Sequence, residues 1–115
     1  RWLKPGGHLV LSTPDAGSWM ATIFRRNWLG FRSVDEHLYF FNRTTINHAL
    51  KLAGLTPVCF TYTGKYLNLP RIVTRLRYYT RAGTVLLRFS ETRLPDRSVY
   101  LNPLDTMMVA GQKRL

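Results

Sequence analysis

Residues 4–15, KPGGHLVLSTPD, decide how the rest of the chain is interpreted. The glycine pair allows the backbone conformation that ends a helix, and the proline before it prevents a helix from continuing. Residues 8–13 follow as a strand whose centre is apolar on both faces, which is typical of a strand buried between two helical layers of a parallel sheet. Pro14 ends this strand because proline cannot donate to a ladder. Asp15 is therefore expected at the carboxyl end of the strand, where ligands bind in open α/β sheets.

Helical periodicity begins some thirty residues later. Apolar side chains recur at i, i+3, i+4 and i+7 and are followed by Gly54, which predicts a helix capped at its start by Asn42 or by Thr44. Residues 56–57, Thr-Pro, predict a turn that leads into a strand over residues 58–63.

Alternation in that strand places Val58, Phe60 and Tyr62 on one face. A second amphipathic helix is predicted to begin near Pro70, and a last strand over residues 106–112. The resulting order of strand, helix, strand, helix, strand indicates an α/β fold, and no linker divides the chain into two domains.

Composition restricts the class of protein. The 115 residues suit one small domain or part of a larger one, and 45% of them are hydrophobic, enough to form a core. No apolar run is long enough to span a bilayer. The single Cys59 cannot form an internal disulfide, which fits a reducing compartment, so we expect a cytoplasmic location. The chain opens on Arg1 rather than methionine, and we interpret it as the back part of a longer protein.

Three stretches resemble class I S-adenosylmethionine-dependent methyltransferases. Residues 1–15, RWLKPGGHLVLSTPD, resemble the segment around the fifth strand of these enzymes, where a helix ends in an L-K-P-G-G turn. Residues 36–46, EHLYFFNRTTI, and residues 52–58, LAGLTPV, resemble the passages that lead into their sixth strand. The nearest subgroup is the small-molecule methyltransferases that include the ubiquinone-biosynthesis type of O-methyltransferase.

The resemblance implies a particular part of that fold. The sequence has no G-x-G-x-x-G loop of the kind that holds the cofactor S-adenosylmethionine. Residues 1–115 are therefore expected to be a single partial domain, the C-terminal half of a Rossmann-like sheet with strands five to seven. The last strand should lie between the other two and run antiparallel to them. The main cofactor-binding site would lie in a missing N-terminal half. The unpaired edge of residues 8–13 predicts that the isolated chain self-associates or needs that half.

The resemblance also suggests site residues. The histidine that matches His37 lies near the active site of these enzymes, which makes it the candidate base that removes a proton from the acceptor; the alternative is that it only orders its loop. From its place at the carboxyl end of the first strand, Asp15 is a candidate for contact with the substrate or the cofactor; the alternative is that it begins a turn or caps the next helix. Residues 16–41 are a candidate lid over a pocket. The aromatic side chains that could wall an acceptor site, or equally pack in the core, are Trp19, Trp28, Tyr39 and Phe40.

Basic residues exceed acidic ones by 17 to 6, and seven arginines fall between positions 71 and 97. We expect residues 65–98 to form a basic helical insertion. Its arginines have three interpretations. The one we favour is a helix face that is solvated or paired with acidic residues of the missing half. The others are an anionic membrane or lipid-linked acceptor, and nucleic acid, which we do not expect as a partner. The alternative function is accordingly a non-catalytic basic α/β module. The histidines and Cys59 lack metal-ligand spacing, so no metal is expected.

Overall fold

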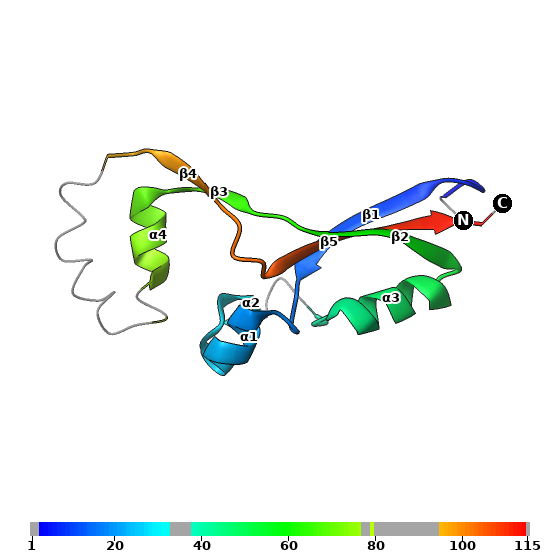
Figure 1. Ribbon diagram of the computed structural model, residues 1–115, viewed down its shortest axis with the longest axis horizontal. Coiled ribbons are helices and arrows are strands. Elements are labelled where there is room, and N and C mark those ends of the chain that lie inside the picture. Colours follow the sequence, from blue (N-terminus) through cyan, green and yellow to red (C-terminus); the bar gives the residue numbers. More distant parts are fainter. Residues whose placement is uncertain (1–2, 33–37, 77–78, 80–94, 115) are drawn as a thin grey trace.

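The computed structural model describes residues 3–32, 38–76, 79 and 95–114. These residues form strands and helices in an α/β arrangement, which is drawn in Figure 1. In chain order the elements are β1 (His8–Pro14), α1 (Trp19–Phe24), the 3-10 turn η1 (Arg25–Asn27), α2 (Leu29–Arg32), α3 (Arg43–Leu52), β2 (Leu55–Tyr62), β3 (Lys65–Asn68), α4 (Leu69–Leu76), β4 (Ser98–Leu101) and β5 (Thr106–Lys113).

The main sheet has three strands in the order β1-β5-β2, and β5 runs antiparallel to both neighbours. β1 and β2 consequently point the same way on either side of the last strand (Figure 1). Hydrogen bonds between Gly6 and Gly7 and the far end of β5 extend the ladder beyond β1. Gly6 has a φ of 77°, a conformation in which glycine is favoured, so the predicted glycine turn before the first strand is confirmed.

The first strand was predicted to end at residue 13, just before Pro14, and it ends one residue later. Pro14 is the last residue of β1 and lies opposite Thr106 of β5. β1 is an edge strand of the described sheet, and proline is tolerated at an edge because its missing N–H removes no central ladder bond.

The core lies between α3 and one face of the sheet. Ile46 and Leu50 of α3 pack with Leu55, Met107 and Val109, all of them buried. This contact explains why α3 forms: its apolar stripe has the helical period and a sheet face on which to be buried. The predicted helix is confirmed, and its end at Gly54, with a φ of 74°, is confirmed as well.

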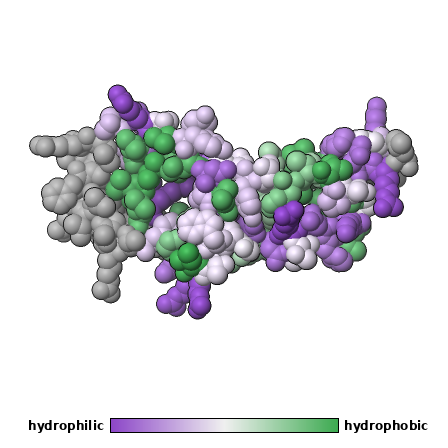
Figure 2. Space-filling view, viewed as in Figure 1, coloured by the Kyte–Doolittle hydropathy of each residue, from purple (hydrophilic) through white to green (hydrophobic). Residues whose placement is uncertain are grey.

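The prediction that residues 8–13 are buried between two helical layers is wrong for the part of the chain that is described. Val10 of β1 is 60% exposed and lies beside Ala110 of β5 and, across it, Cys59 of β2. We call this side of the sheet the open face. Figure 2 shows hydrophobic side chains on the surface over this region, at the end of the molecule away from α4.

The second strand begins earlier than predicted. β2 starts at Leu55, so residues 56–57 lie within the strand instead of forming a turn. The pairing with β5 shifts between Pro57 and Cys59. Val58 sits at this irregularity and is 49% exposed, whereas Phe60 and Tyr62 pack against the core. An inserted residue rotates the strand before it, which is why the simple alternation failed at Val58.

A second, two-stranded sheet was not foreseen. β3 and β4 pair antiparallel, with Lys65 opposite Leu101, and α4 follows β3 directly. We call this unit the β3–β4 ribbon. The predicted helix near Pro70 and the predicted final strand are both confirmed, as α4 and β5. The expected helical insertion over residues 65–98 thus contains strand residues at both ends, and most of its centre lies outside the described residues.

Candidate functional site

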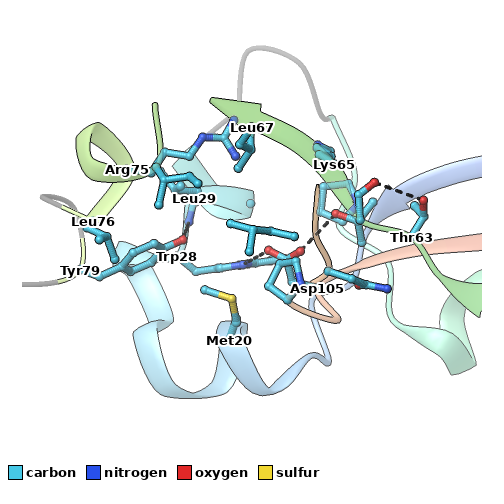
Figure 3. A pocket seen from close by; sticks show the side chains of 18 residues that line it. Met20, Trp28, Leu29, Thr63, Lys65, Leu67, Arg75, Leu76, Tyr79 and Asp105 are labelled. Atoms are coloured by element: carbon cyan, nitrogen blue, oxygen red, sulfur yellow. Dashed lines mark hydrogen bonds between the residues drawn. The ribbon is translucent and has the colours of Figure 1, made fainter. Parts of the chain in front are cut away.

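A pocket of about 550 Å³ opens between the end of β1, the α1–α2 segment, α4 and the β3–β4 ribbon (Figure 3). Its walls include Pro14 at the carboxyl end of β1 and Thr106 at the start of β5. Because β5 is antiparallel to β1, the beginning of the last strand lies at the edge where β1 ends. The pocket therefore occupies the position in which open α/β sheets bind ligands.

Most of the pocket wall is apolar. The apolar side chains come from segments that are distant in sequence, and the three-stranded main sheet contributes few of them. The apolar side chains that line the pocket include Met20, Trp28, Leu29, Leu67, Ile72, Leu76 and Leu101.

Trp28 and Asp105 form the centre of the pocket in Figure 3. Trp28 is completely buried, and its indole Nε1 donates a hydrogen bond to Asp105 Oδ2 at 3.2 Å. Thr106 Oγ1 donates to the other carboxylate oxygen at 3.3 Å. A side chain at Gly30 would collide with the Trp28 ring, so glycine is needed there for the indole to lie flat on the backbone. The Asp105 carboxylate is thus held at a fixed position in the pocket wall.

Tyr79 closes the pocket beside Leu29. The Leu29 backbone N–H donates to Tyr79 Oη at 3.2 Å, and the Tyr79 ring packs against Phe24 with centroids 4.2 Å apart. Burial raises the pKa of Tyr79. The hydrogen bond from the Leu29 backbone lowers this pKa by less, and the smaller effects of Asp105, which raises it, and Arg75, which lowers it, follow. The phenol therefore stays protonated, and its O–H can donate to a ligand.

Asp15 directly follows Pro14, which lines the pocket, but the Asp15 side chain is buried within the fold. It is 2% exposed; Tyr62 Oη donates to its Oδ2 at 2.9 Å, and the Gly17 backbone N–H donates to its Oδ1 at 2.8 Å. The second bond is a local turn of the kind that aspartate forms with a backbone N–H two residues ahead. Burial, followed by the hydrogen bond to Asp15, raises the pKa of Tyr62. Asp15 does not line the pocket, and its role in substrate binding stays a prediction.

The other predicted site residues are arranged around the pocket without lining it. Trp19 is half exposed and donates through Nε1 to the Pro103 carbonyl at 2.7 Å. Phe40 packs edge-on against Phe31, which packs edge-on against Trp28. Tyr39 is 74% exposed. These three substrate-binding roles stay predictions, while Trp28, the fourth candidate aromatic, does line the pocket.

The candidate base His37 lies outside the described residues. The same is true of residues 33–36, so the lid expected over residues 16–41 is described only in part. Its described portion contributes Met20, Trp28, Leu29 and Gly30 to the pocket.

Lys65, Arg75 and Asp105 were not singled out from the sequence. One signal could have located Asp105: an acidic residue just before an antiparallel last strand must lie beside the carboxyl end of the first strand. Lys65 and Arg75 had no such signal, because nothing in the sequence showed that a ribbon and α4 lie beside the α1–α2 segment beyond the sheet edge.

The described residues offer no group of three or more His, Cys, Asp or Glu side chains that could hold a metal ion. No G-x-G-x-x-G spacing occurs anywhere in the sequence, and the pocket contains no equivalent loop among its lining residues. These residues do not by themselves form a site for S-adenosylmethionine. No helix within the described ranges is long and apolar enough to cross a membrane.

Comparison with protein families identifies the chain. A family model described as a methyltransferase domain matches residues 1–60, which is more than half of the 115 residues. The chain belongs to this methyltransferase-domain family. The match covers β1, α1, α2, α3 and most of β2. The matched residues of this methyltransferase domain therefore include the part of the pocket wall that β1 and the α1–α2 segment supply. Comparisons with curated proteins and with solved structures found no match.

Proposed function

We propose that this methyltransferase domain transfers a methyl group from S-adenosylmethionine to a small or lipid-linked acceptor bound in the pocket. The observation that carries the proposal is the position of the pocket at the carboxyl end of β1, with a fixed carboxylate inside apolar walls. The proposed location is the cytoplasm, at the membrane surface if the acceptor is lipid-linked; a single cysteine, Cys59, fits this.

The strand order supports a more specific assignment within the fold. We assign β1, β2 and β5 as the fifth, sixth and seventh strands of a class I methyltransferase sheet, the enzyme being of the small-molecule type. In this assignment the last strand lies between the other two and runs antiparallel to them, as β5 does. The proposal also places the main cofactor-binding loop outside residues 1–115, because their sequence has no G-x-G-x-x-G spacing.

The residues of this chain have the task of positioning the acceptor. Methyl transfer is an in-line displacement, so rate depends on holding the acceptor atom in line and on removing its proton. Each oxygen of Asp105 accepts one hydrogen bond in the fold and retains a further lone pair for an acceptor hydroxyl. Asp105 and His37 are the two groups we propose for the proton. Trp28 and the apolar walls exclude water from the reacting atoms.

The test is a methyl-transfer assay with labelled S-adenosylmethionine on the complete polypeptide that contains these residues. Asp105→Asn is expected to lower kcat by about a hundredfold or more, since general base catalysis contributes roughly 10²–10⁴. His37→Gln is tested in the same way.

The matched control is Asp96→Asn, which changes an exposed carboxylate that accepts a hydrogen bond from Asn68 and does not line the pocket. Circular dichroism verifies that each variant is folded. If the complete, folded polypeptide transfers no methyl group to any hydroxyl or amine acceptor, the proposed function is wrong. If Asp105→Asn turns over like Asp96→Asn, the role of Asp105 is wrong.

A further inference from the structure

We propose that the pocket selects an amphiphilic ligand with an apolar body and an anionic group, and that Lys65 and Arg75 bind the anion. This inference rests on the proposed function because it names the class of acceptor for that site.

The interior of the pocket matches an apolar ligand body. A volume of about 550 Å³ falls within the range of roughly 300–1,000 Å³ that is usual for small-molecule sites. Trp28 is completely buried, and the side chains of Met20, Leu67 and Ile72 are partly buried around it. An apolar chain placed there removes the exposed parts of Met20, Leu67 and Ile72 from water, which is the main source of affinity in such a site.

The mouth of the pocket is cationic. Lys65 of β3 and Arg75 of α4 line the pocket and are both exposed, so they lie where it meets solvent. Figure 3 shows both on the same side of the pocket, opposite Met20. An anion bound by these two side chains would lie at the solvent end of the pocket, with the apolar interior beyond it. An amphiphile has the same arrangement of a charged group and an apolar body.

The two cations are not used by the fold. Within the described part of the chain, neither Lys65 nor Arg75 forms a side-chain hydrogen bond or an ion pair, whereas Asp105 has both carboxylate oxygens hydrogen-bonded, to Trp28 and Thr106. With two cations against one carboxylate among the lining residues, the pocket carries a net positive charge and favours an anion. A guanidinium and an ammonium are each suited to a carboxylate or a phosphate.

The experiment measures binding by calorimetry with the full polypeptide, without cofactor, below the micelle concentration of each probe. The probes are decanoate and decyl phosphate as anions, decanol as the neutral match and decyltrimethylammonium as the cation. We expect the anions to bind at least about tenfold more tightly than the cation. Arg75→Gln and Lys65→Gln should each weaken anion binding about threefold to tenfold and leave decanol binding unchanged.

Arg71→Gln is the matched control, because Arg71 is an exposed arginine one turn earlier on the same helix that does not line the pocket. It should leave decanoate binding unchanged. Equal affinity for anionic and cationic probes would overturn the inference. So would an Arg71→Gln effect as large as that of Arg75→Gln, or binding only to anionic vesicles, since both would indicate a general basic surface.

This result is separable from the proposed function. If the anionic probes bind as expected and no acceptor is methylated, the ligand class is supported and the methyl-transfer proposal fails. If methyl transfer occurs to an uncharged acceptor and Arg75→Gln leaves its KM unchanged, the inference is overturned while the methyl-transfer proposal stands.

Discussion

Asp15 and Asp105 show how the surroundings of a residue determine what it can do. Both lie at the same edge of the sheet, and the Asp15 backbone N–H donates to the Asp105 carbonyl at 2.8 Å. Asp15 is buried with Tyr62 and the following turn, so its carboxylate stabilises the fold. Asp105 is only partly buried and lines the pocket, so its carboxylate is available to a ligand.

Tyr62→Phe tests the structural role of Asp15. The change removes one hydrogen bond from a buried carboxylate and is expected to lower the free energy of unfolding by about 1–3 kcal/mol at neutral pH. Chemical denaturation measures the difference. Tyr66→Phe, at an exposed tyrosine, is the control and should change stability little.

The raised pKa of Tyr62 leads to a second prediction for the Tyr62→Phe variant. Folding raises the pKa of Tyr62 above its usual 10.0, so the folded state favours the protonated phenol. The contribution of Tyr62 to stability is therefore complete below pH 10.0 and is lost as the pH rises through the higher folded value. Stability should decline less steeply above pH 10.0 in Tyr62→Phe than in the unchanged protein. Tyr79, whose pKa is also raised, contributes a decline of the same sign in both proteins.

At the scale of the element, α3 shows which of two possible caps is used. The Asn42 side chain accepts from the Thr45 backbone N–H at 2.8 Å, and Thr45 Oγ1 accepts from the Asn42 backbone N–H at 2.8 Å. Asn42→Ala should therefore lower stability by about 0.5–2 kcal/mol. Thr44→Ala, at the other candidate cap, is the control and should lie within about 0.5 kcal/mol of the unchanged protein. Equal effects in thermal unfolding would mean that Asn42 is not the cap.

The β3–β4 ribbon depends on glycine at its base. A Cβ at Gly64 would collide with the Leu101 carbonyl oxygen and the Tyr100 ring, and the Gly64 N–H donates to Tyr100 Oη at 3.0 Å. Gly64→Ala should displace the ribbon and with it Lys65, which lines the pocket.

The expected result for Gly64→Ala is a loss of decanoate affinity of about tenfold or more, beyond what either single cation variant shows. Calorimetry measures the affinity, and Gly54→Ala is the comparison because a Cβ there meets no atom, although its φ of 74° still strains alanine. Unchanged decanoate binding in Gly64→Ala would show that the ribbon does not shape the pocket.

At the scale of the whole molecule, the described chain is elongated. Its extents are 57 × 28 × 22 Å and its radius of gyration is 17.5 Å, against roughly 13 Å for a compact domain of about 100 residues. The open face of the sheet adds exposed apolar side chains such as Val10 and Met108, and β1 has an unpaired edge within the described sheet. An exposed apolar edge pairs readily with another chain.

We therefore predict that the isolated 115-residue chain self-associates, as its sequence also suggested. Light scattering should show the average mass rising with concentration. Val10→Lys should reduce this association because a charge on an edge strand opposes pairing, while His48→Lys, at an exposed position of α3, should not. A monodisperse monomer at high concentration would contradict the prediction.

The sequence by itself determined the local elements and the family. The apolar period and the cap at Asn42 are complete within a dozen residues, so α3 was predicted with nearly its observed bounds, as was β5. The glycine turn before β1 was equally local. These features depend only on residues that are close together in the chain, so the sequence alone is enough to predict them.

Only the tertiary structure decided which elements cover one another, and with that the pocket. The sequence shows that both sides of β1 are apolar at its centre but not whether a helix covers each side, so the exposure of Val10 was not foreseen. The irregularity at Val58 arises from pairing with β5. Trp28, Lys65, Arg75 and Asp105 lie far apart in sequence and share a pocket because the α1–α2 segment, α4 and the β3–β4 ribbon meet beyond the carboxyl end of β1. A contact of this kind depends on the packing of whole elements, and no local pattern encodes it.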